Sequence, residues 1–293
     1  MASAELRTIQ RRIKSVQSTM KITRAMELIA ASRIVRAQQR VAAAQPYTKK
    51  MTEVIRNVAA ASGGVSHPLL EQREQRTAGV LAVTSDRGLA GAYNTNIIRM
   101  AERRLLELNR DDTDYRLYVV GRKAQSYFRY RGYQVERAFL GVTDTPGYGD
   151  ARAIANILMN DYAEGAVDAV RVFSTQFVSA LTQKPVSFDL LPIEPPEDAG
   201  GDAPAATGYT YEPSAEAILD RLLPRYVEAV AFGTLLDASA SEHAARRRAM
   251  KAATENAEEL TRLLTREANQ ARQAEITTEI SEIVGGAEAM TQG

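Results

Sequence analysis

The feature that most constrains this sequence is a run of apolar residues, spaced alternately by three and four, close to its beginning. Leu6, Ile9, Ile13, Val16 and Met20 follow that rule, which places them on one helical face as the seam of a coiled coil. After a shift near Thr23, the seam resumes at Met26, Ala30, Ile34, Ala37, Val41, Ala44, Met51, Ile55 and Val58. The spacing predicts one helix, roughly 85 Å long at 1.5 Å per residue.

The ends of this first helix carry recognisable signals. Ser3 is a plausible N-cap, and Glu5 in the first turn suits the helix dipole. Ser62-Gly63-Gly64 is expected to end the helix. Pro46 lies inside it and predicts a kink, because proline lacks an N–H and clashes with the preceding turn.

A second long seam occupies the last eighty residues. Ser214 is expected to cap a helix that continues to Val284, where Gly285-Gly286 should stop it. Pro224 predicts a break or kink near its beginning. Its apolar stripe consists of Ile218, Leu222, Val230, Met250, Ala253, Ala257, Leu260, Leu264, Ala268 and Ala271.

Between the two seams, the hydrophobic period changes to one typical of alternating strands and helices. Strands are predicted at Val80–Thr84, Leu117–Val120, Val135–Leu140, Ala169–Thr175 and Val186–Leu191. Helices are predicted at Thr95–Leu108, Lys123–Arg131 and Asp150–Ala163. This alternation favours a small α/β domain with a mostly parallel sheet. The Pro-, Gly-, Ala- and Asp-rich segment from Glu194 to Gly208 is expected to be a flexible surface loop.

The predicted fold is therefore a long antiparallel coiled coil of N- and C-terminal helices, with a small α/β domain inserted between them. Its parts are an N-terminal helix (1–61), the α/β domain (62–208, with the loop 194–208) and a C-terminal helix with a projecting tip (209–293). Both helices must leave the same domain, so they can pair only antiparallel.

This arrangement also predicts a pairing register. If Val58 and Ser214 lie side by side, the numbers of paired residues should sum to about 272, which places Met26 opposite about Arg246. The last turns, roughly Arg272 to Val284, would then have no partner within the chain. Ile276, Ile280 and Ile283 share one side of those turns. Since isolated helices of this length are marginal in water, something else should hold the tip.

Composition and charge narrow the classes of function. The chain has no cysteine and only two histidines, His67 and His243, which excludes disulfides, a cysteine nucleophile and the usual His/Cys metal sites. Residues 1–60 hold 12 Lys or Arg against 3 Asp or Glu, a net charge of +9, whereas residues 214–293 hold 9 against 13, a net charge of −4. The Arg-rich start imitates a mitochondrial transit peptide, but its apolar pattern continues unbroken to about residue 58, which indicates part of the mature fold. Two arms of opposite charge suggest contact with each other or with an external acidic partner.

No motif predicts catalysis. Thr84 to Asn94 (TSDRGLAGAYN) follows a predicted strand, but it lacks the Gly-Lys-Ser/Thr ending of a phosphate loop and the GxGxxG of a dinucleotide site. Gly88 and Gly91 are better explained as residues that let a helix pack closely on a sheet. Asp111, Asp112 and Asp114 indicate an exposed acidic turn rather than a metal site, and the arginines 246–248 indicate a solvated face or a partner contact. We expect no catalytic residue, cofactor or metal ligand.

Four segments resemble one known family along the whole chain. They are Ile9 to Gln39 (IQRRIKSVQSTMKITRAMELIAASRIVRAQQ), Thr84 to Ile97, Tyr209 to Asp220 (YTYEPSAEAILD) and Ser241 to Met290. They resemble the γ subunit of F-type, proton-translocating ATP synthases. Members commonly carry Cys where Ala90 stands, a substitution that does not disturb the pattern. The chloroplast form's Cys-bearing regulatory insert is missing, and so is a transit peptide, which favours a bacterial protein.

The resemblance implies a central-stalk rotor without a catalytic site of its own. Such a subunit couples proton-driven rotation of the membrane c-ring to conformational changes at the β-subunit catalytic sites, for ATP synthesis or, in reverse, hydrolysis. It implies partners in the α and β subunits, the ε subunit and the c-ring, and a peripheral position at the cytoplasmic face of the plasma membrane. The alternatives are a soluble coiled-coil scaffold and a nucleotide-dependent enzyme that uses the α/β domain.

The resemblance also implies partner contacts for individual residues. Arg24 and Met26, in KITRAM, match positions neighbouring Glu242 and Arg246, in SEHAAR, within the rotor shaft. Tyr209 matches a position near the c-ring and ε, although it could be an ordinary turn aromatic. The positions that match contacts with β-subunit loops are Arg272, Gln273, Thr277, Glu279 and Glu282.

Overall fold

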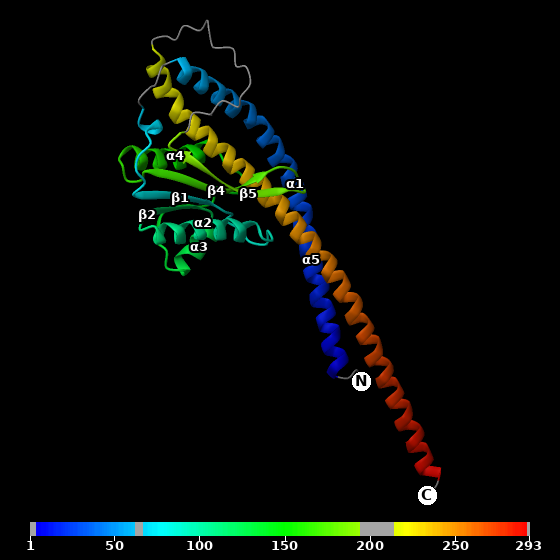
Figure 1. Cartoon of the computed structure of the whole chain (residues 1–293). Coiled ribbons are helices and arrows are strands. Elements are labelled where there is room, and N and C mark those ends of the chain that lie inside the picture. Colours follow the sequence, from blue (N-terminus) through cyan, green and yellow to red (C-terminus); the bar gives the residue numbers. More distant parts are fainter. Residues whose placement is uncertain (1–3, 62–66, 194–213, 292–293) are drawn as a thin grey trace. The chain divides into compact units, whose positions relative to one another are not determined.

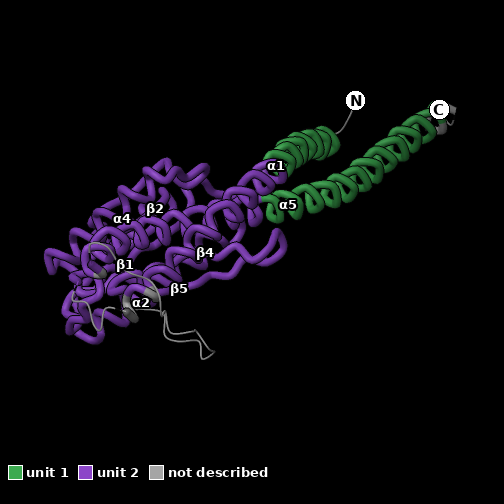
Figure 2. Tube along the Cα trace, turned by 90° about the horizontal axis from the view of Figure 1, so that it is seen from above, with its two compact units in different colours: residues 1–29, 247–293 green, residues 30–246 purple. Residues whose placement is uncertain are grey.

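The computed structural model describes residues 4–61, 67–193 and 214–291 (Figure 1). The chain divides into two compact units, one of residues 1–29 and 247–293, the other of residues 30–246 (Figure 2). Helix α1 (Ala4–Ala61) and helix α5 (Ala215–Thr291) each contribute to both units. The predicted cap Ser3 and the predicted loop Glu194–Gly208 lie outside the described residues.

The unit of residues 30–246 contains a five-stranded sheet in the order β3-β2-β1-β4-β5. Neighbouring strands are parallel except for β4 and β5, which are antiparallel. The mostly parallel sheet predicted from the sequence is confirmed, and all five predicted strands are present. Their bounds are β1 Thr77–Val83, β2 Asp114–Val120, β3 Val135–Phe139, β4 Ala169–Phe177 and β5 Gln183–Leu191.

Helices cover both faces of this sheet, as Figure 1 shows. They are α2 (Tyr93–Arg110), α3 (Arg122–Tyr130) and α4 (Tyr148–Ala163), with a short 3-10 turn η1 (Pro68–Leu70). On β1, Val80 and Ala82 join the core formed with α2 and α3, whereas Leu81 and Val83 join the core formed with α4 and α5. Successive side chains of a strand point to opposite faces, so a strand covered on both sides is apolar throughout.

The long helices help to build the second of these cores. Ile55 and Val58, near the end of α1, are buried in it together with Leu219, Leu223 and Val227 of α5. Each large apolar side chain that is fully buried contributes about 1.5–3 kcal/mol relative to exposure. Within this unit α1 and α5 are therefore integral parts of the α/β domain.

The two helices also pack directly on each other, antiparallel, in a register that corrects the predicted one. In the unit of residues 30–246, Ala37 and Val41 cluster with Leu236 and Ala240. In the other unit the hydroxyls of Thr23 and Thr254 are 2.8 Å apart. The Thr23–Thr254 pair sums to 277, and the antiparallel pairing of Ala37 with Ala240 and of Val41 with Leu236 within the cluster gives the same sum.

The predicted sum of 272 is therefore wrong by five residues, and position 251, not Arg246, belongs opposite Met26. The error arose at the assumed hinge. Helix α1 continues to Ala61, three residues beyond Val58, and α5 begins at Ala215. The ends nearest the domain thus sum to 276, close to the register seen along the helices.

The helix signals had mixed outcomes. The N-cap is confirmed, because the Ala217 N–H donates to the Ser214 hydroxyl at 3.2 Å. Pro46 and Pro224 each lie inside a continuous helix, so the break considered for Pro224 is absent, and a kink at either proline stays a prediction. The predicted stop at Gly285-Gly286 is wrong, because α5 continues to Thr291. Strong helix formers such as Ala287 follow the glycines, and their helix propensity offsets part of the cost of the two glycines.

The end of α5 presents exposed side chains. Leu264 is still buried in the unit of residues 1–29 and 247–293, but Ile276, Ile280 and Ile283 are 48%, 56% and 71% exposed. Within that unit, the described side chains from 276 to 287 are all exposed. The face predicted to need an external partner is thus uncovered.

Candidate functional site

The sheet topology marks one place where a ligand would be expected. The chain proceeds outward from β1 to β2 and β3, then returns to place β4 on the other side of β1. In open α/β sheets, ligands bind outside the carboxyl ends of the strands at such a reversal. The loop after β1 (residues 84–92) and the end of β4 border this switch point.

The loop after β1 is held by its own side chains. Asn94 Oδ1 accepts from both the backbone N–H and the hydroxyl of Ser85, at 2.9 Å each. The Asp86 carboxylate accepts from the Gly141 N–H at 2.9 Å and the Thr143 hydroxyl at 3.0 Å. These bonds tie the loop to the segment that follows β3, so its backbone geometry is fixed.

Glycine has a different role here from the one predicted. The residue that permits close approach is Gly121, after β2, where a Cβ would lie 2.7 Å from the backbone carbon of Ser85. Gly91 adopts a φ of 57°, so it serves the turn. A Cβ on Gly88 would meet only the Lys123 side chain at 3.4 Å. The prediction that close packing of a helix on the sheet requires a glycine is therefore wrong for Gly88, and for Gly91 it stays a prediction.

Helix α5 fills the switch point with an ion pair. Arg246 Nη2 donates to Glu242 Oε1 at 2.6 Å and to the Gly88 carbonyl, in the loop after β1, at 3.2 Å. One turn earlier, the Ser241 hydroxyl donates to the carbonyl of Thr175, near the end of β4, at 3.4 Å. Glu242 is 1% exposed and Arg246 7%. The predicted solvated face for residues 246–248 is therefore wrong at Arg246, although Arg247 and Arg248 are exposed.

Burial dominates the electrostatics of this pair. It raises the pKa of the Glu242 carboxyl to about 7, although Arg246 acts in the opposite direction. The adjacent Tyr93 is fully enclosed, and burial raises its pKa well above the usual value. Removing one partner from such a pair would leave an uncompensated charge in a dry environment. The pair thus fixes α5 to the loop and leaves a switch point occupied by the chain itself.

The loop after β3 that contains Asp144 makes the second set of contacts with the long helices. Its carboxylate forms an ion pair with Arg33 of α1. Its carbonyl accepts from the Ser239 hydroxyl at 3.1 Å and lies 3.3 Å from His243 Nε2, both on α5. Burial lowers the pKa of His243, so its imidazole is neutral at neutral pH. One loop therefore holds both long helices.

A third connection joins α4 to α5 through Glu228, which is 4% exposed. The Tyr148 hydroxyl donates to Glu228 Oε2 at 2.6 Å. Arg225 Nη1 lies 3.2 Å from the same oxygen, and Arg152 Nε lies 3.4 Å from Oε1. Two hydrogen bonds, from Tyr148 and Arg225, and an ion pair with Arg152 offset the cost of burying this carboxylate. We call the groups centred on Glu242, Asp144 and Glu228 the three polar clamps.

The structure brings together two of the residues predicted as contacts, Glu242 and Arg246. On α1, Arg24 is exposed and Met26 is half-buried. Tyr209 lies outside the described residues. The predicted tip residues are all exposed on α5, namely Arg272, Gln273, Thr277, Glu279 and Glu282.

Sequence reasoning missed Asp144, Glu228 and Ser239. Glu228 had a usable signal, because it is an acidic residue among the apolar neighbours Val227 and Ala229 on a helix. Asp144 had none, because it stands in a short loop whose partners are about a hundred residues away in the chain.

Two further observations concern the described part of the chain. Within residues 4–61, 67–193 and 214–291, no three His, Cys, Asp or Glu side chains gather as ligands for a metal ion. Over the same residues, no helix combines the length and the apolar character needed to cross a membrane.

Solved structures of ATP synthases contain chains with a similar fold. A chain from Euglena gracilis mitochondrial ATP synthase superposes with a TM-score of 0.69 at 18% identity, covering 98% of this chain and 94% of that one. A chain from the central stalk/c-ring structure of Tetrahymena thermophila mitochondrial ATP synthase gives a TM-score of 0.60 at 22% identity, covering 79% and 99%. At these identities the likeness concerns the fold alone.

Comparison of sequences, unlike that of folds, identifies the family. The family model described as ATP synthase matches residues 5–290. The ATP synthase gamma chain of Parafrankia sp. (strain EAN1pec) is 49% identical over 99% of both chains. That of Acidothermus cellulolyticus is 51% identical over 98% of this chain and 97% of its own. These full-length matches confirm the resemblance found in the sequence: the chain belongs to the ATP synthase gamma chain family.

Proposed function

We propose that this chain is the central-stalk rotor subunit of a proton-translocating ATP synthase. It couples rotation of a membrane c-ring to conformational changes at catalytic sites on the β subunits, and it catalyses no reaction itself. Its partners are a hexamer of α and β subunits, an ε subunit and the c-ring. It works as a peripheral component at the cytoplasmic face of a bacterial plasma membrane.

The observation that carries this proposal is the occupied switch point. A nucleotide-dependent enzyme built on this sheet would need that place for its ligand. Here Glu242 and Arg246 fill it and bind α5 to the loop after β1. A site given over to fastening a helix suits an element that transmits force and does not suit one that binds a nucleotide.

The two units support complementary roles. In the unit of residues 30–246, the polar clamps and the shared core hold α1 and α5 to the α/β domain. In the other unit the helices pair with each other and leave apolar side chains such as Ile22, Leu28 and Ile276 at least 48% exposed. Exposed apolar faces of this kind mark surfaces that meet a partner.

We assign the partner contacts accordingly. Arg24 and Met26 on α1 face the α and β subunits, and Tyr209 contacts ε or the c-ring. Toward the end of α5, the β-subunit loops meet Arg272, Gln273, Thr277, Glu279 and Glu282. Because each contact of a rotor must break and reform at every step, the polar contacts are transient and the isoleucines supply apolar contact of little directionality.

The test is assembly followed by coupled activity. The full chain, tagged and expressed with the other subunits, should co-purify with α, β and ε, and the complex in vesicles should make ATP when a proton gradient is applied. Truncation from Arg272 onward should weaken assembly and coupling while the α/β domain remains folded. Truncation after Gly285 is the matched control and should have a mild effect. Full coupled synthesis by the longer truncation would contradict the contacts assigned to the tip, and purification of the chain without any subunit would contradict the proposed function.

A further inference from the structure

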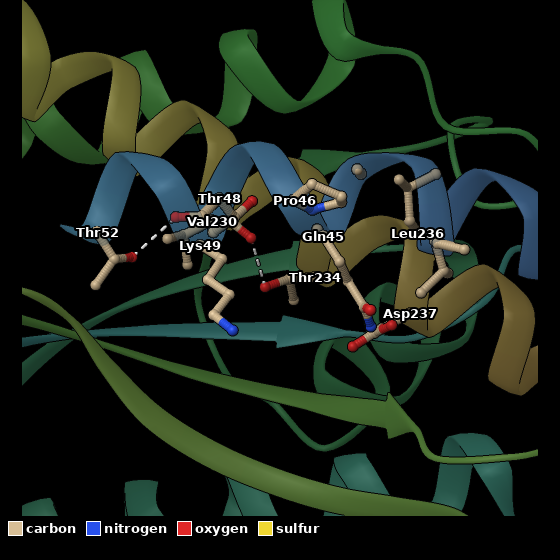
Figure 3. A pocket seen from close by; sticks show the side chains of 13 residues that line it. Gln45, Pro46, Thr48, Lys49, Thr52, Val230, Thr234, Leu236 and Asp237 are labelled. Carbon is tan, nitrogen blue, oxygen red and sulfur yellow. Dashed lines mark hydrogen bonds between the residues drawn. The ribbon is translucent and has the colours of Figure 1, made fainter. Parts of the chain in front are cut away.

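A groove runs between α1 and α5 in the unit of residues 30–246 (Figure 3). Its volume is about 610 Å³, which falls in the range of sites for small molecules. Residues 41–52 of α1 form one wall and residues 230–237 of α5 the other. Apolar lining comes from side chains such as Val41, Val230 and Leu236.

The groove is open because small residues face each other across it. Ala42 and Ala44 line the α1 side, and Gly233 lines the α5 side. A Cβ on Gly233 would have no heavy atom within 4 Å. Glycine within a helix costs about 1 kcal/mol relative to alanine, and here no crowding requires it. The space beside Gly233 is therefore free for another molecule.

Three hydrogen-bond acceptors lie along the groove. Asp237 supplies a carboxylate to the lining. Pro46, also in the lining, has no N–H, so the Ala42 carbonyl four residues earlier lacks its usual helical donor. The Thr234 hydroxyl donates to the Val230 carbonyl at 2.8 Å, which leaves its lone pairs for an incoming donor.

Asp237 is only partly hydrated. Burial raises the pKa of its carboxyl to about 6, against a hydrogen bond from the Phe177 backbone. In Figure 3 the Gln45 side chain extends toward Asp237, whereas Lys49 extends in another direction. Within the described residues, Lys49 forms no ion pair with Asp237 and lies exposed at the rim. The half-buried Asp237 carboxylate therefore forms no ion pair within the described residues.

A second, smaller cavity of about 280 Å³ adjoins the groove and shares Thr234 and Asp237 with it. Ser174 and Thr175 of β4 also line it. Both are nearly fully buried, and their hydroxyls have no hydrogen-bond partner within the described part of the chain. Buried hydroxyls of native proteins are nearly always paired. These two groups add donor and acceptor capacity on the far side of Asp237.

We propose that this groove binds a small organic amine, with its ammonium group on Asp237 and its apolar body along the groove between α1 and α5. A carboxylate, a freed backbone carbonyl and a threonine hydroxyl can accept the three N–H bonds of a primary ammonium ion. The apolar walls suit an alkyl or aryl chain. A carboxylate ligand would instead meet Asp237 as a like charge.

The proposal can be tested by titrating the full-length chain with three probes of equal length, n-hexylamine, n-hexanol and hexanoate, and following backbone amide NMR signals. Hexylamine should shift the signals of residues 230–237 and bind at least ten times more tightly than hexanol. Hexanoate should bind more weakly than either. Equal affinity for amine and alcohol, or shifts spread over the whole surface, would overturn the proposal.

Substitutions identify the groups responsible. Asp237→Asn keeps the shape but removes the charge, so hexylamine affinity should fall about tenfold to the level of hexanol. Gly233→Leu should fill the groove and abolish binding of both probes, and the free space at that position makes the substitution compatible with folding. Glu259→Gln, on an exposed part of α5, is the matched control and should change nothing. Undiminished hexylamine binding in either groove variant would refute the assignment.

Discussion

Helix α5 behaves differently in the two units that it joins. From Leu219 to Arg246 it is buried or half-buried at most positions and contributes side chains to all three polar clamps. From Arg247 onward, within the described residues, only Met250, Thr254, Ala257 and Leu264 are buried. The same helix is thus embedded in a domain over one stretch and touches mainly a single helix over the other.

The difference shows how one helix can serve two purposes. Where α5 must not slip, buried ion pairs and hydrogen bonds to loops fix its rotation and position, and breaking one costs several kcal/mol. Over the second stretch, a seam of few buried residues is enough for pairing, and most of the surface stays exposed. Three predictions follow this contrast, in order of expected effect.

The largest effect is expected at the first clamp. Glu242→Ala leaves the Arg246 guanidinium buried without its carboxylate, which should lower the free energy of unfolding by about 3–5 kcal/mol. Unfolding of the full chain in denaturant measures this loss of free energy. The matched control, Glu259→Gln on the exposed stretch of α5, should change it by less than about 0.5 kcal/mol. Equal effects at the two positions would remove the contrast between the units.

The second prediction concerns pH. Because burial raises the pKa of Glu242 from 4.5 to about 7, the folded state holds this proton more tightly than the unfolded state. Protonated Glu242 therefore stabilises the folded state. This contribution is fully present below pH 4.5 and is lost as pH rises through 7, by on the order of 3 kcal/mol. Burial lowers the pKa of His243, so the stability that neutral His243 contributes is present above the ordinary pKa of histidine and is lost as pH falls.

The difference between the native chain and Glu242→Gln isolates this contribution. Unfolding free energies measured from pH 4 to 8 should show the native chain losing stability with rising pH relative to the variant. Parallel curves for the two proteins would mean that Glu242 keeps an ordinary pKa and that the switch point is wetter than described.

The smallest effect is expected in the paired helices. Thr23→Val removes one partner of the Thr23–Thr254 hydrogen bond and leaves the buried Thr254 hydroxyl only with the Met250 carbonyl of its own helix, at a cost of about 1 kcal/mol. The double variant with Thr254→Val replaces both by apolar groups of similar shape and should recover part of that cost. A double-mutant cycle by thermal unfolding measures the coupling, and strictly additive losses would show that the two hydroxyls do not interact.

Local sequence signals predicted the elements well and their contacts only partly. The strand predicted at Val186–Leu191 could be recognised because apolar Val186, Phe188 and Leu190 alternate with polar Ser187 and Asp189, a pattern that depends only on neighbours in sequence. The register of α1 on α5 depends on which residues of the two helices face each other at the domain, and no apolar pattern marks that point. Taking Val58 and Ser214 as the facing residues moved every predicted pair by five residues.

Only part of the site could be predicted from the sequence, for a similar reason. Glu242 and Arg246 lie one turn apart in a recognisable motif, so the family resemblance identified them. Asp144 is paired with residues 95 to 111 positions away, and no local pattern encodes such a pairing. That Arg246 is buried and not solvated also depends on the loop after β1, which only the folded sheet brings to it.

The central claim is that α1 and α5 turn together as one rotor element, and a disulfide between them tests it most directly. The chain has no cysteine, so Thr23→Cys with Thr254→Cys introduces one pair at positions whose hydroxyls are 2.8 Å apart. In the assembled complex, mild oxidation should form this bond within the chain, and proton-driven ATP synthesis in vesicles should stay within about twofold of the reduced sample. Each single cysteine variant controls for oxidation elsewhere. Loss of synthesis on oxidation, restored by a reductant, would show that the two helices must move against each other and would contradict the account.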